Sequence, residues 1–154
     1  MINKKDIITF AAVLHEIEKR STCVRIKIAS LIIKDGRIIS MGWNGVPSGL
    51  EHCEDYFKNG THNIEHEHHE YALKNEIHAE QNAISYAARI GNATEGTDII
   101  SSVSPCLYCA KMIIAAGISN VYYIKKYERE EGDHALELLK KANVAVYDVK
   151  KILS

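Results

Sequence analysis

The sequence predicts one domain, residues 1–154, with an α/β fold: a three-layer α/β/α sandwich around a mixed five-stranded sheet. The first observation is that apolar residues follow helical and strand periods in the order α-β-β-α-β-α-β-α-β along the chain. The second is a strong hairpin signal, Asp35-Gly36, between two apolar runs. The third is that the 154 residues contain no internal repeat and no linker, which suits a single hydrophobic core.

The first third of the chain is expected to form a helix and a hairpin. Apolar residues recur at near-helical spacing over 5–19, which predicts an amphipathic helix. Residues 26–33 are rich in β-branched side chains, and the apolar pattern resumes over 37–41 after the Asp35-Gly36 turn. Residues 42–49 hold three glycines and a proline, so we expect a loop there.

A polar stretch rich in histidine and glutamate follows at about 50–75, as an insert in the domain. It is long for a loop within a small domain, which indicates that the segment either is disordered or has a specific function. Three of its histidines, His62, His66 and His69, are expected to be solvated.

The second half of the chain is expected to alternate helices and strands. A helix is predicted over 77–90, with Gly91 as its C-terminal cap. Another is predicted to begin at Ser104, whose hydroxyl can cap it while Pro105 occupies the first turn, and to run to Ala116. The remaining elements are strands over 98–103, 120–124 and 144–147 and a helix over 131–142.

The charge of the chain restricts its partners. The net charge is −1, and basic and acidic residues are spread along the sequence. Nucleic-acid binding through phosphates requires a basic face, which no run of Lys and Arg supplies, so we expect no nucleic-acid partner. A small anion such as a mononucleotide requires only one or two cations. No apolar run is long enough to span a bilayer, and the N-terminus lacks the apolar stretch of a signal peptide. We therefore expect a cytoplasmic protein with no membrane partner, in the host cytoplasm if the gene is viral.

The cysteines and histidines predict metal binding. Four cysteines and eight histidines in a reducing compartment favour metal ligation over disulfides. Cys106 and Cys109 are three residues apart at a helix start, so both sulfurs can reach one ion, and the positive helix end favours thiolates. With His78 they would leave the fourth tetrahedral position of a zinc ion open, as in catalytic sites.

Glu80 lies two residues after His78 and is the candidate catalytic proton shuttle. It would take a proton from zinc-activated water, pass one to a ring nitrogen and help protonate the leaving ammonia. Residues two apart point to different sides of a regular helix, so His78 must lie at the helix entry, where the backbone is not yet helical. The combined His-x-Glu and Pro-Cys-x-x-Cys pattern matches the signature of zinc nucleobase deaminases.

Three segments of the chain resemble the deoxycytidylate deaminases of the cytidine deaminase-like family, and most closely the phage-type members. The likeness extends over about residues 5–148 and is carried mainly by 75–84 and 104–114, together with the glycine-rich loop 42–49. It implies hydrolytic deamination of dCMP to dUMP and ammonia, which supplies dUMP for thymidylate synthesis.

The resemblance also assigns roles to single residues. It implies that His78, Cys106 and Cys109 hold the catalytic zinc and that Glu80 shuttles protons. The substrate-binding groups it implies are Asn44 for the sugar, the backbones of Ala79 and Ser104 for the pyrimidine edge, and Tyr127.

Regulation and assembly are likewise implied by the family. Its members are activated by dCTP and inhibited by dTTP, each bound with Mg²⁺, and they form homohexamers. The residues implied in the regulatory site are Gly42, Trp43, Asn44, Gly45 and Arg89, although the family usually has Tyr at the position of Trp43. Tyr86, Arg89 and Tyr127 are further candidates for phosphate or subunit contacts.

A second, structural zinc is implied by the phage-type relatives. Cys23, Cys53, His68 and Glu76 stand at the positions of its Cys, Cys, His and Glu ligands. Four protein ligands would close the site to water, as structural zinc prefers. Such a site would keep the polar insert ordered. The alternative is that Cys23 and Cys53 are ordinary reduced thiols.

Other functions remain open at this point. A tRNA adenosine deaminase shares the zinc motif, but the near-neutral charge and the insert before His78 disfavour it. Free cytidine and guanine lack a phosphate, so as substrates they would offer the glycine-rich loop fewer groups to bind. A silent deaminase-fold protein that only binds nucleotides would be expected to lack Glu80, which is present.

Overall fold

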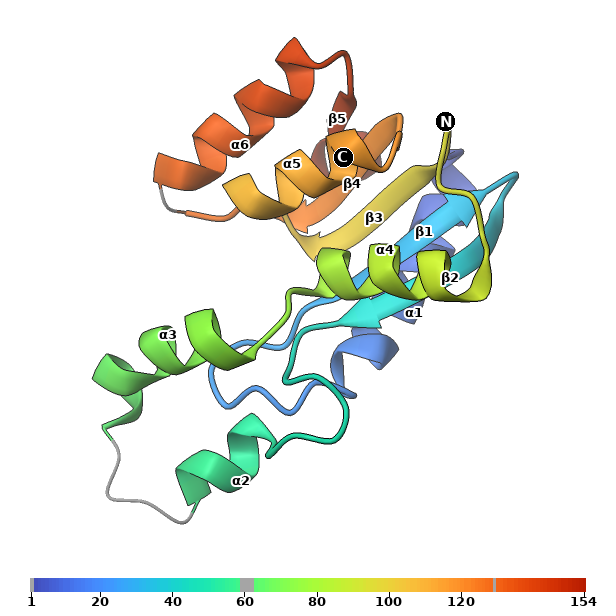
Figure 1. The fold of residues 1–154 in the computed structure, drawn as a ribbon. Coiled ribbons are helices and arrows are strands. Elements are labelled where there is room, and N and C mark those ends of the chain that lie inside the picture. The colour runs from blue at the N-terminus through green and yellow to red at the C-terminus, as the bar shows by residue number, and fades with distance from the viewer. Residues whose placement is uncertain (1, 59–62, 129) are drawn as a thin grey trace.

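A mixed five-stranded sheet forms the centre of the computed structural model, which describes residues 2–58, 63–128 and 130–154 (Figure 1). The strand order is β2-β1-β3-β4-β5. β1 is antiparallel to both β2 and β3, whereas β3, β4 and β5 are parallel. The predicted mixed α/β sheet is therefore confirmed. The strands are β1 (Ala29–Lys34), β2 (Arg37–Trp43), β3 (Asp98–Val103), β4 (Asn120–Lys125) and β5 (Ala145–Asp148).

The predicted hairpin joins β1 to β2. Asp35 and Gly36 both have positive φ, 50° and 71°, as a two-residue turn of this sequence requires. β2 continues to Trp43, which pairs with Ala29. Gly42 and Trp43 are thus strand residues, and the prediction that they begin a loop is wrong. Pairing with β1 extends the strand through a glycine that sequence rules assign to loops.

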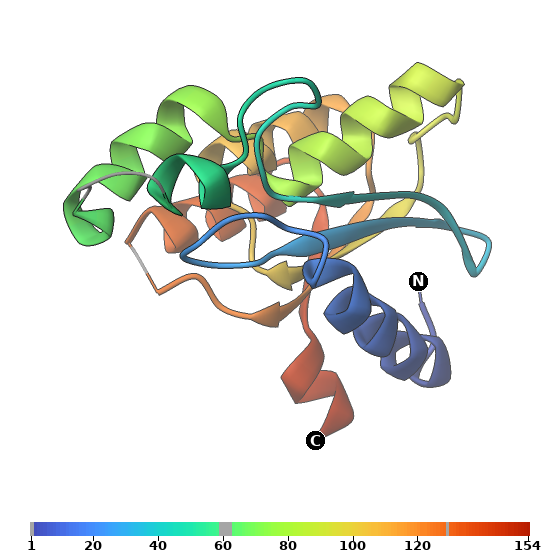
Figure 2. The same ribbon diagram turned by 90° about the horizontal axis from the view of Figure 1, so that it is seen from below.

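Helices cover both faces of the sheet and complete the three layers (Figure 2). On one face, α1 packs Ile7, Phe10 and Leu14 against Leu31 and Ile100 of the sheet. Neighbouring Ile99 contributes to the opposite face, because successive strand side chains point to opposite sides. The helices are α1 (Lys4–Glu18) and α7 (Val149–Leu153) on the first face, and α4 (Ala79–Ile90), α5 (Leu107–Ala115) and α6 (Glu130–Lys141) on the second. α7 was not predicted.

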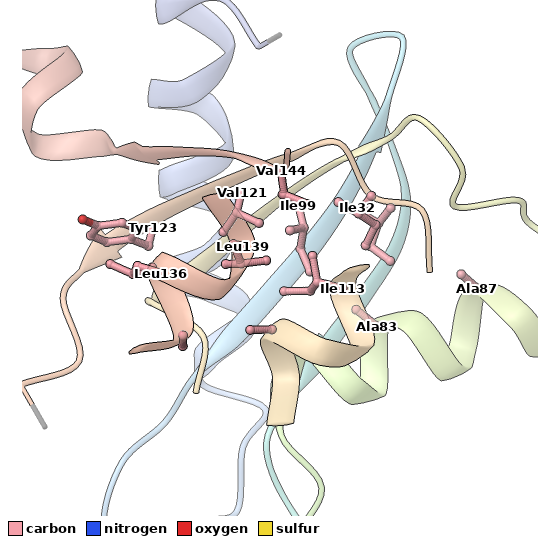
Figure 3. Packing of buried hydrophobic residues seen from close by; sticks show 13 residues of the cluster. Ile32, Ala83, Ala87, Ile99, Ile113, Val121, Tyr123, Leu136, Leu139 and Val144 are labelled. Carbon is pink, nitrogen blue, oxygen red and sulfur yellow. The ribbon is translucent and has the colours of Figure 1, made fainter. Parts of the chain in front are cut away.

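The second face holds the larger hydrophobic cluster (Figure 3). Ile99 and Val121 of the sheet pack against Ile113 of α5 and Leu139 of α6. On α4 the buried side chains are mostly small, such as Ala83 and Ala87, so the helix approaches β2 closely. A Cβ atom at Gly42 would lie 2.4 Å from both the Ala79 carbonyl oxygen and the Ala83 amide nitrogen. The helix that carries His78 and Glu80, α4, therefore packs directly against Gly42 of β2, where a larger residue would clash with the helix backbone.

The polar insert is largely helical. It forms α2 (Cys53–Lys58) and α3 (Ile64–Asn75), so the expectation of a loop or disorder is wrong for these residues. Only His68 of α3 is buried, and His66 and His69 are exposed as expected. His62 lies outside the described residues.

Within residues 2–58, 63–128 and 130–154, no helix is both long and apolar enough to cross a bilayer.

Gly42→Ala is expected to destabilise the fold. The added methyl group must push α4 away from β2, and overpacking of this kind costs about 1–3 kcal/mol. Chemical unfolding monitored by circular dichroism measures the loss. Met41→Ala, an exposed neighbour on the same strand, is the control and should change the free energy of unfolding much less. Equal stability of Gly42→Ala and the wild type would contradict the close approach of α4.

Candidate metal centre and active site

Two helix N-termini bring the first set of candidate ligands together. His78 is the N-cap of α4 and Cys106 is the N-cap of α5, and both have extended backbone. The expectation that His78 lies just before the helix is confirmed. The prediction that Ser104 caps the next helix is wrong, because its hydroxyl instead accepts a hydrogen bond from the Tyr127 amide at 2.8 Å. Cys106 instead occupies the N-cap position of α5.

The donor atoms of His78, Cys106 and Cys109 match the spacing of a zinc site. The Nδ1 atom of His78 lies 3.4 Å from each of the two sulfurs. Tetrahedral zinc with Zn–S of about 2.3 Å and Zn–N of about 2.0 Å places nitrogen and sulfur about 3.5 Å apart. His78 is exposed, Cys106 half-buried and Cys109 buried, so the set is open on one side. These residues fit a metal that keeps one position for water or substrate.

Electrostatics at this cluster also favours a cation. A hydrogen bond from Cys109 lowers the pKa of the Cys106 thiol to about 4, and the same contact raises the pKa of Cys109. Hydrogen bonding to Cys106 raises the pKa of His78. The lowered pKa favours the thiolate form of Cys106. A divalent cation would stabilise the second thiolate, because it removes the repulsion between the two sulfurs.

Glu80 lies in the first turn of α4 and is almost fully buried, with 5% of its surface exposed. Burial raises the pKa of its carboxyl group. A carboxyl group in such a place binds and releases a proton closer to neutral pH than an exposed one does. This is the property that a proton shuttle needs.

A pocket of about 470 Å³ lies in front of these groups. It brings Asn44, Ser104 and Tyr127 together with Glu80, as the predicted substrate site requires. Ala79 is buried beside them and is not part of the lining. The pocket is lined by Cys23, Arg25, Ile26, Ile28, Asn44, Glu65, His68, His69, Ala72, Glu76, His78, Glu80, Val103, Ser104, Cys106 and Tyr127.

Asn44 also shapes the pocket wall. Its Oδ1 accepts a hydrogen bond from the Ile28 amide and its Nδ2 donates to the Ile26 carbonyl, both at 2.8 Å. An amide offers two lone pairs and two N–H groups, so one of each remains for a ligand.

The other residues expected to bind a regulator lie outside this pocket. Gly42 is buried beneath α4, and the Arg20 guanidinium lies 4.5 Å above the ring of Trp43. Gly45 pairs with Ile77. Arg89 is exposed in the last turn of α4, roughly 16 Å along the helix axis from His78.

A second set of donors comes from four separate segments. Cys23 follows α1, Cys53 begins α2, His68 lies in α3 and Glu76 follows α3. The structure brings one ligand atom of each within 4.8 Å of the others. The Sγ atom of Cys23 lies 3.2 Å from His68 Nε2, which in turn lies 3.9 Å from Glu76 Oε1. In contrast to the first set, these side chains are buried.

The chemistry of the second set fits a resident cation. Glu76 Oε1 is buried and has no hydrogen-bond partner among the described residues, a costly state for a carboxylate oxygen. Burial raises the pKa of the Cys23 thiol, and that of Cys53 to about 12. A divalent cation would satisfy the oxygen and stabilise both thiolates. Four protein donors would close the site, as in structural zinc sites.

The comparisons with known proteins agree with this geometry. The model of the cytidine and deoxycytidylate deaminase zinc-binding region matches residues 4–125. The chain belongs to this family.

Three proteins that match more than nine-tenths of this chain illustrate the similarity. The deoxycytidylate deaminase of Enterobacteria phage T4 is 33% identical over 93% of this chain and 89% of its own. The ComE operon protein 2 of Bacillus subtilis is 38% identical over 92% of this chain and 69% of its own. The dCMP deaminase of cyanophage S-TIM5, solved with dCMP and dUMP, is 28% identical, with a TM-score of 0.77 over 96% of this chain and 99% of its own.

Three polar residues of the pocket lining, Arg25, Glu65 and His69, were not foreseen as site residues. The signal lies in their neighbours: Arg25 is two residues after Cys23, and His69 directly follows His68. Proximity to a candidate ligand is the sequence signal for Arg25 and His69, but it does not show that their side chains line the pocket.

The zinc content of ligand variants tests the two donor sets. We expect about two zinc ions per wild-type chain, and about one each for Cys53→Ala and Cys109→Ala, because each loses a ligand of one set. Elemental analysis after dialysis gives the numbers. His66→Ala, an exposed histidine of the insert, is the control and should retain both ions. One ion per chain in a fully active wild-type sample would exclude the second site.

Proposed function

We propose that this chain is a zinc-dependent deaminase that hydrolyses dCMP to dUMP and ammonia. The observation that carries the proposal is the open set of His78, Cys106 and Cys109 beside the buried Glu80 in one pocket. The phage relatives are named deoxycytidylate deaminases, and the S-TIM5 enzyme binds dCMP and dUMP. Both resemble this chain over almost its whole length, which supports the same substrate here.

Zinc at the open set would supply Lewis acidity, which can lower the pKa of water from about 15.7 to about 7. His78, Cys106 and Cys109 would hold it at the floor of the pocket. The exposed side of this ligand set leaves room for the 4-amino end of a cytosine base.

Glu80 carries the proton transfers in this proposal. Its carboxylate accepts a proton from the attacking water and donates one to N3 of the ring. It then assists protonation of the amino group, which leaves as ammonia. Burial raises the pKa of the Glu80 carboxyl group, which favours its uptake of the proton from water in this cycle.

Substrate orientation is assigned to groups around the pocket. The free N–H and lone pair of the Asn44 amide suit a sugar hydroxyl. The backbone groups of Ala79 and Ser104 are assigned to the pyrimidine edge. Tyr127 is assigned to the wall of the substrate pocket, because the hydrogen bond from its backbone amide to the Ser104 hydroxyl holds it there.

The second donor set is proposed to hold a structural zinc. Cys23, Cys53, His68 and Glu76 would join the two insert helices to the segment after α1. The insert has a small hydrophobic cluster of its own around Phe57, so metal ligation would account for much of its order.

Regulation and assembly complete the proposal. dCTP with Mg²⁺ is proposed to activate and dTTP to inhibit the enzyme. The proposed regulatory site comprises Gly42, Trp43, Asn44, Gly45 and Arg89. The enzyme is further proposed to act as a homohexamer and to supply dUMP for thymidylate synthesis.

Glu80→Gln is expected to retain zinc and fold but to lose roughly a hundred- to ten-thousandfold in kcat, because the amide cannot shuttle protons. Steady-state turnover of dCMP with parallel zinc analysis measures this. Cys106→Ala is the contrasting variant and should lose both a zinc ion and activity. Full activity of zinc-loaded Glu80→Gln would rule out the assigned role.

A substrate panel tests the proposed function as a whole. We expect strong preference for dCMP over deoxycytidine, CMP and a tRNA anticodon stem-loop, and a higher rate on dCMP when dCTP and Mg²⁺ are added. Ammonia release gives the rates. Turnover of the RNA alone would point instead to tRNA deamination, and inactivity of the zinc-loaded protein on every substrate would favour a binding role.

A further inference from the structure

Asn44, the residue assigned above to the sugar, is held by one neighbouring segment of the chain. Its Oδ1 accepts a hydrogen bond from the Ile28 amide and its Nδ2 donates to the Ile26 carbonyl, both at 2.8 Å. Its backbone amide donates to the Ile28 carbonyl at 3.1 Å. Its carbonyl oxygen accepts a hydrogen bond from the Ser21 hydroxyl at 2.8 Å. All of these partners lie between α1 and β1, so this segment sets the place of the Asn44 amide.

Ser21 is the member of this segment that joins Asn44 to the second donor set. Its side chain is buried, and its backbone amide donates to the Glu18 carbonyl in the last turn of α1 at 3.0 Å. Its hydroxyl donates to the Asn44 carbonyl and also accepts a hydrogen bond from the Cys23 amide at 3.2 Å. One hydroxyl therefore links the end of α1, a donor residue of the second set and the residue assigned to the sugar.

The peptide group between Asn44 and Gly45 is held from both sides. Ser21 binds its carbonyl oxygen, and its N–H donates to the Ile77 carbonyl at 3.1 Å. Removal of the Ser21 hydroxyl would leave the buried carbonyl without this partner, and the peptide group would turn to find another. The Asn44 amide must meet a sugar hydroxyl at a fixed angle, because hydrogen bonds weaken steeply when they are misaligned. The orientation of this peptide group therefore affects the sugar contact.

We propose that Ser21 is a positioning residue for recognition of the 3′-hydroxyl of the nucleotide, because it holds Asn44 at the angle that this hydrogen bond requires. The inference rests on the proposed function. A 2′-deoxynucleoside 5′-monophosphate has only this one free sugar hydroxyl, since its 5′ oxygen carries the phosphate. Ser21 is not part of the pocket lining, so it acts on the ligand through Asn44.

The test compares dUMP with 2′,3′-dideoxyuridine 5′-monophosphate, which lacks only the 3′-hydroxyl. Dissociation constants are measured by calorimetry on zinc-loaded protein, and the wild type is expected to bind dUMP more tightly. Ser21→Ala should raise Kd for dUMP roughly three- to tenfold, the value of one hydrogen bond, and leave Kd for the dideoxynucleotide within about twofold. KM for dCMP should rise by a similar factor with little change in kcat, because the sugar contact is equal in the ground state and the transition state.

Ser30→Ala is the matched control. Ser30 is also a buried serine, but its hydroxyl pairs with the Ser101 hydroxyl at 2.7 Å and it does not line the pocket. This variant should lose stability, as Ser21→Ala does, without a change in the preference for dUMP. Thermal unfolding and zinc analysis of each variant show that the compared proteins are folded and loaded.

Amide hydrogen exchange of the wild type tests the same link without a substitution. If Ser21 joins Asn44 to Cys23, saturating dUMP should slow exchange of the Cys23 amide more than the saturating dideoxynucleotide does. The reason is that a bond from the 3′-hydroxyl stabilises the whole network, and such coupling is reciprocal. Equal protection of this amide by the two ligands would contradict the link.

The outcomes separate this inference from the proposed function. In an active dCMP deaminase, equal weakening of both nucleotides by Ser21→Ala, or weakening of neither, would overturn the role of Ser21. Equal binding of the two nucleotides by the wild type would overturn it as well, because no sugar contact would exist to be positioned. Conversely, selective loss of dUMP affinity in a protein without deaminase activity would sustain the positioning role while the proposed reaction failed.

Discussion

The arrangement of both donor sets depends on one short pairing of backbone segments. The Ile77 amide donates to the Gly45 carbonyl at 2.9 Å, and the Gly45 amide donates to the Ile77 carbonyl at 3.1 Å. Glu76 and His78 flank Ile77 in extended backbone, so their side chains face the same side, roughly 7 Å apart along the chain. Glu76 belongs to the closed set, which comprises Cys23, Cys53, His68 and Glu76. His78 belongs to the open set, which comprises His78, Cys106 and Cys109. Fixing Ile77 therefore fixes the spacing between the two donor sets.

The two donor sets use similar residues but differ in burial, and burial decides what each can do. The closed set has four protein donors and includes a buried carboxylate oxygen, Glu76 Oε1, that has no hydrogen-bond partner among the described residues. The open set has three donors and a fourth side that faces a pocket. A cation in the first can only hold segments together, whereas one in the second can meet water and substrate. The buried Glu80 is next to the second set, where a group that transfers protons is needed.

The sequence predicted the parts of the fold that have strong local signals. β3 has the predicted bounds, and Asp35-Gly36 forms the expected turn. The helices of the insert were not predicted, because α3 buries only His68 and so lacks an apolar face. Ser104 matched the rule for a helix cap, yet a distant amide, that of Tyr127, engages its hydroxyl. The ligand residues of the sites were predictable from motifs, but Arg25 and His69 were not, since their place in the pocket depends on the folded insert.

Two candidate metal sites of different kinds meet at the segment from Glu76 to His78. The most direct measurement is diffraction at the zinc absorption edge from crystals of the protein with a bound pyrimidine nucleotide. The account predicts two anomalous peaks, one enclosed by four protein ligands and one with three protein ligands and a non-protein ligand beside Glu80. A single peak, or a fourth protein ligand at the His78 site, would contradict it.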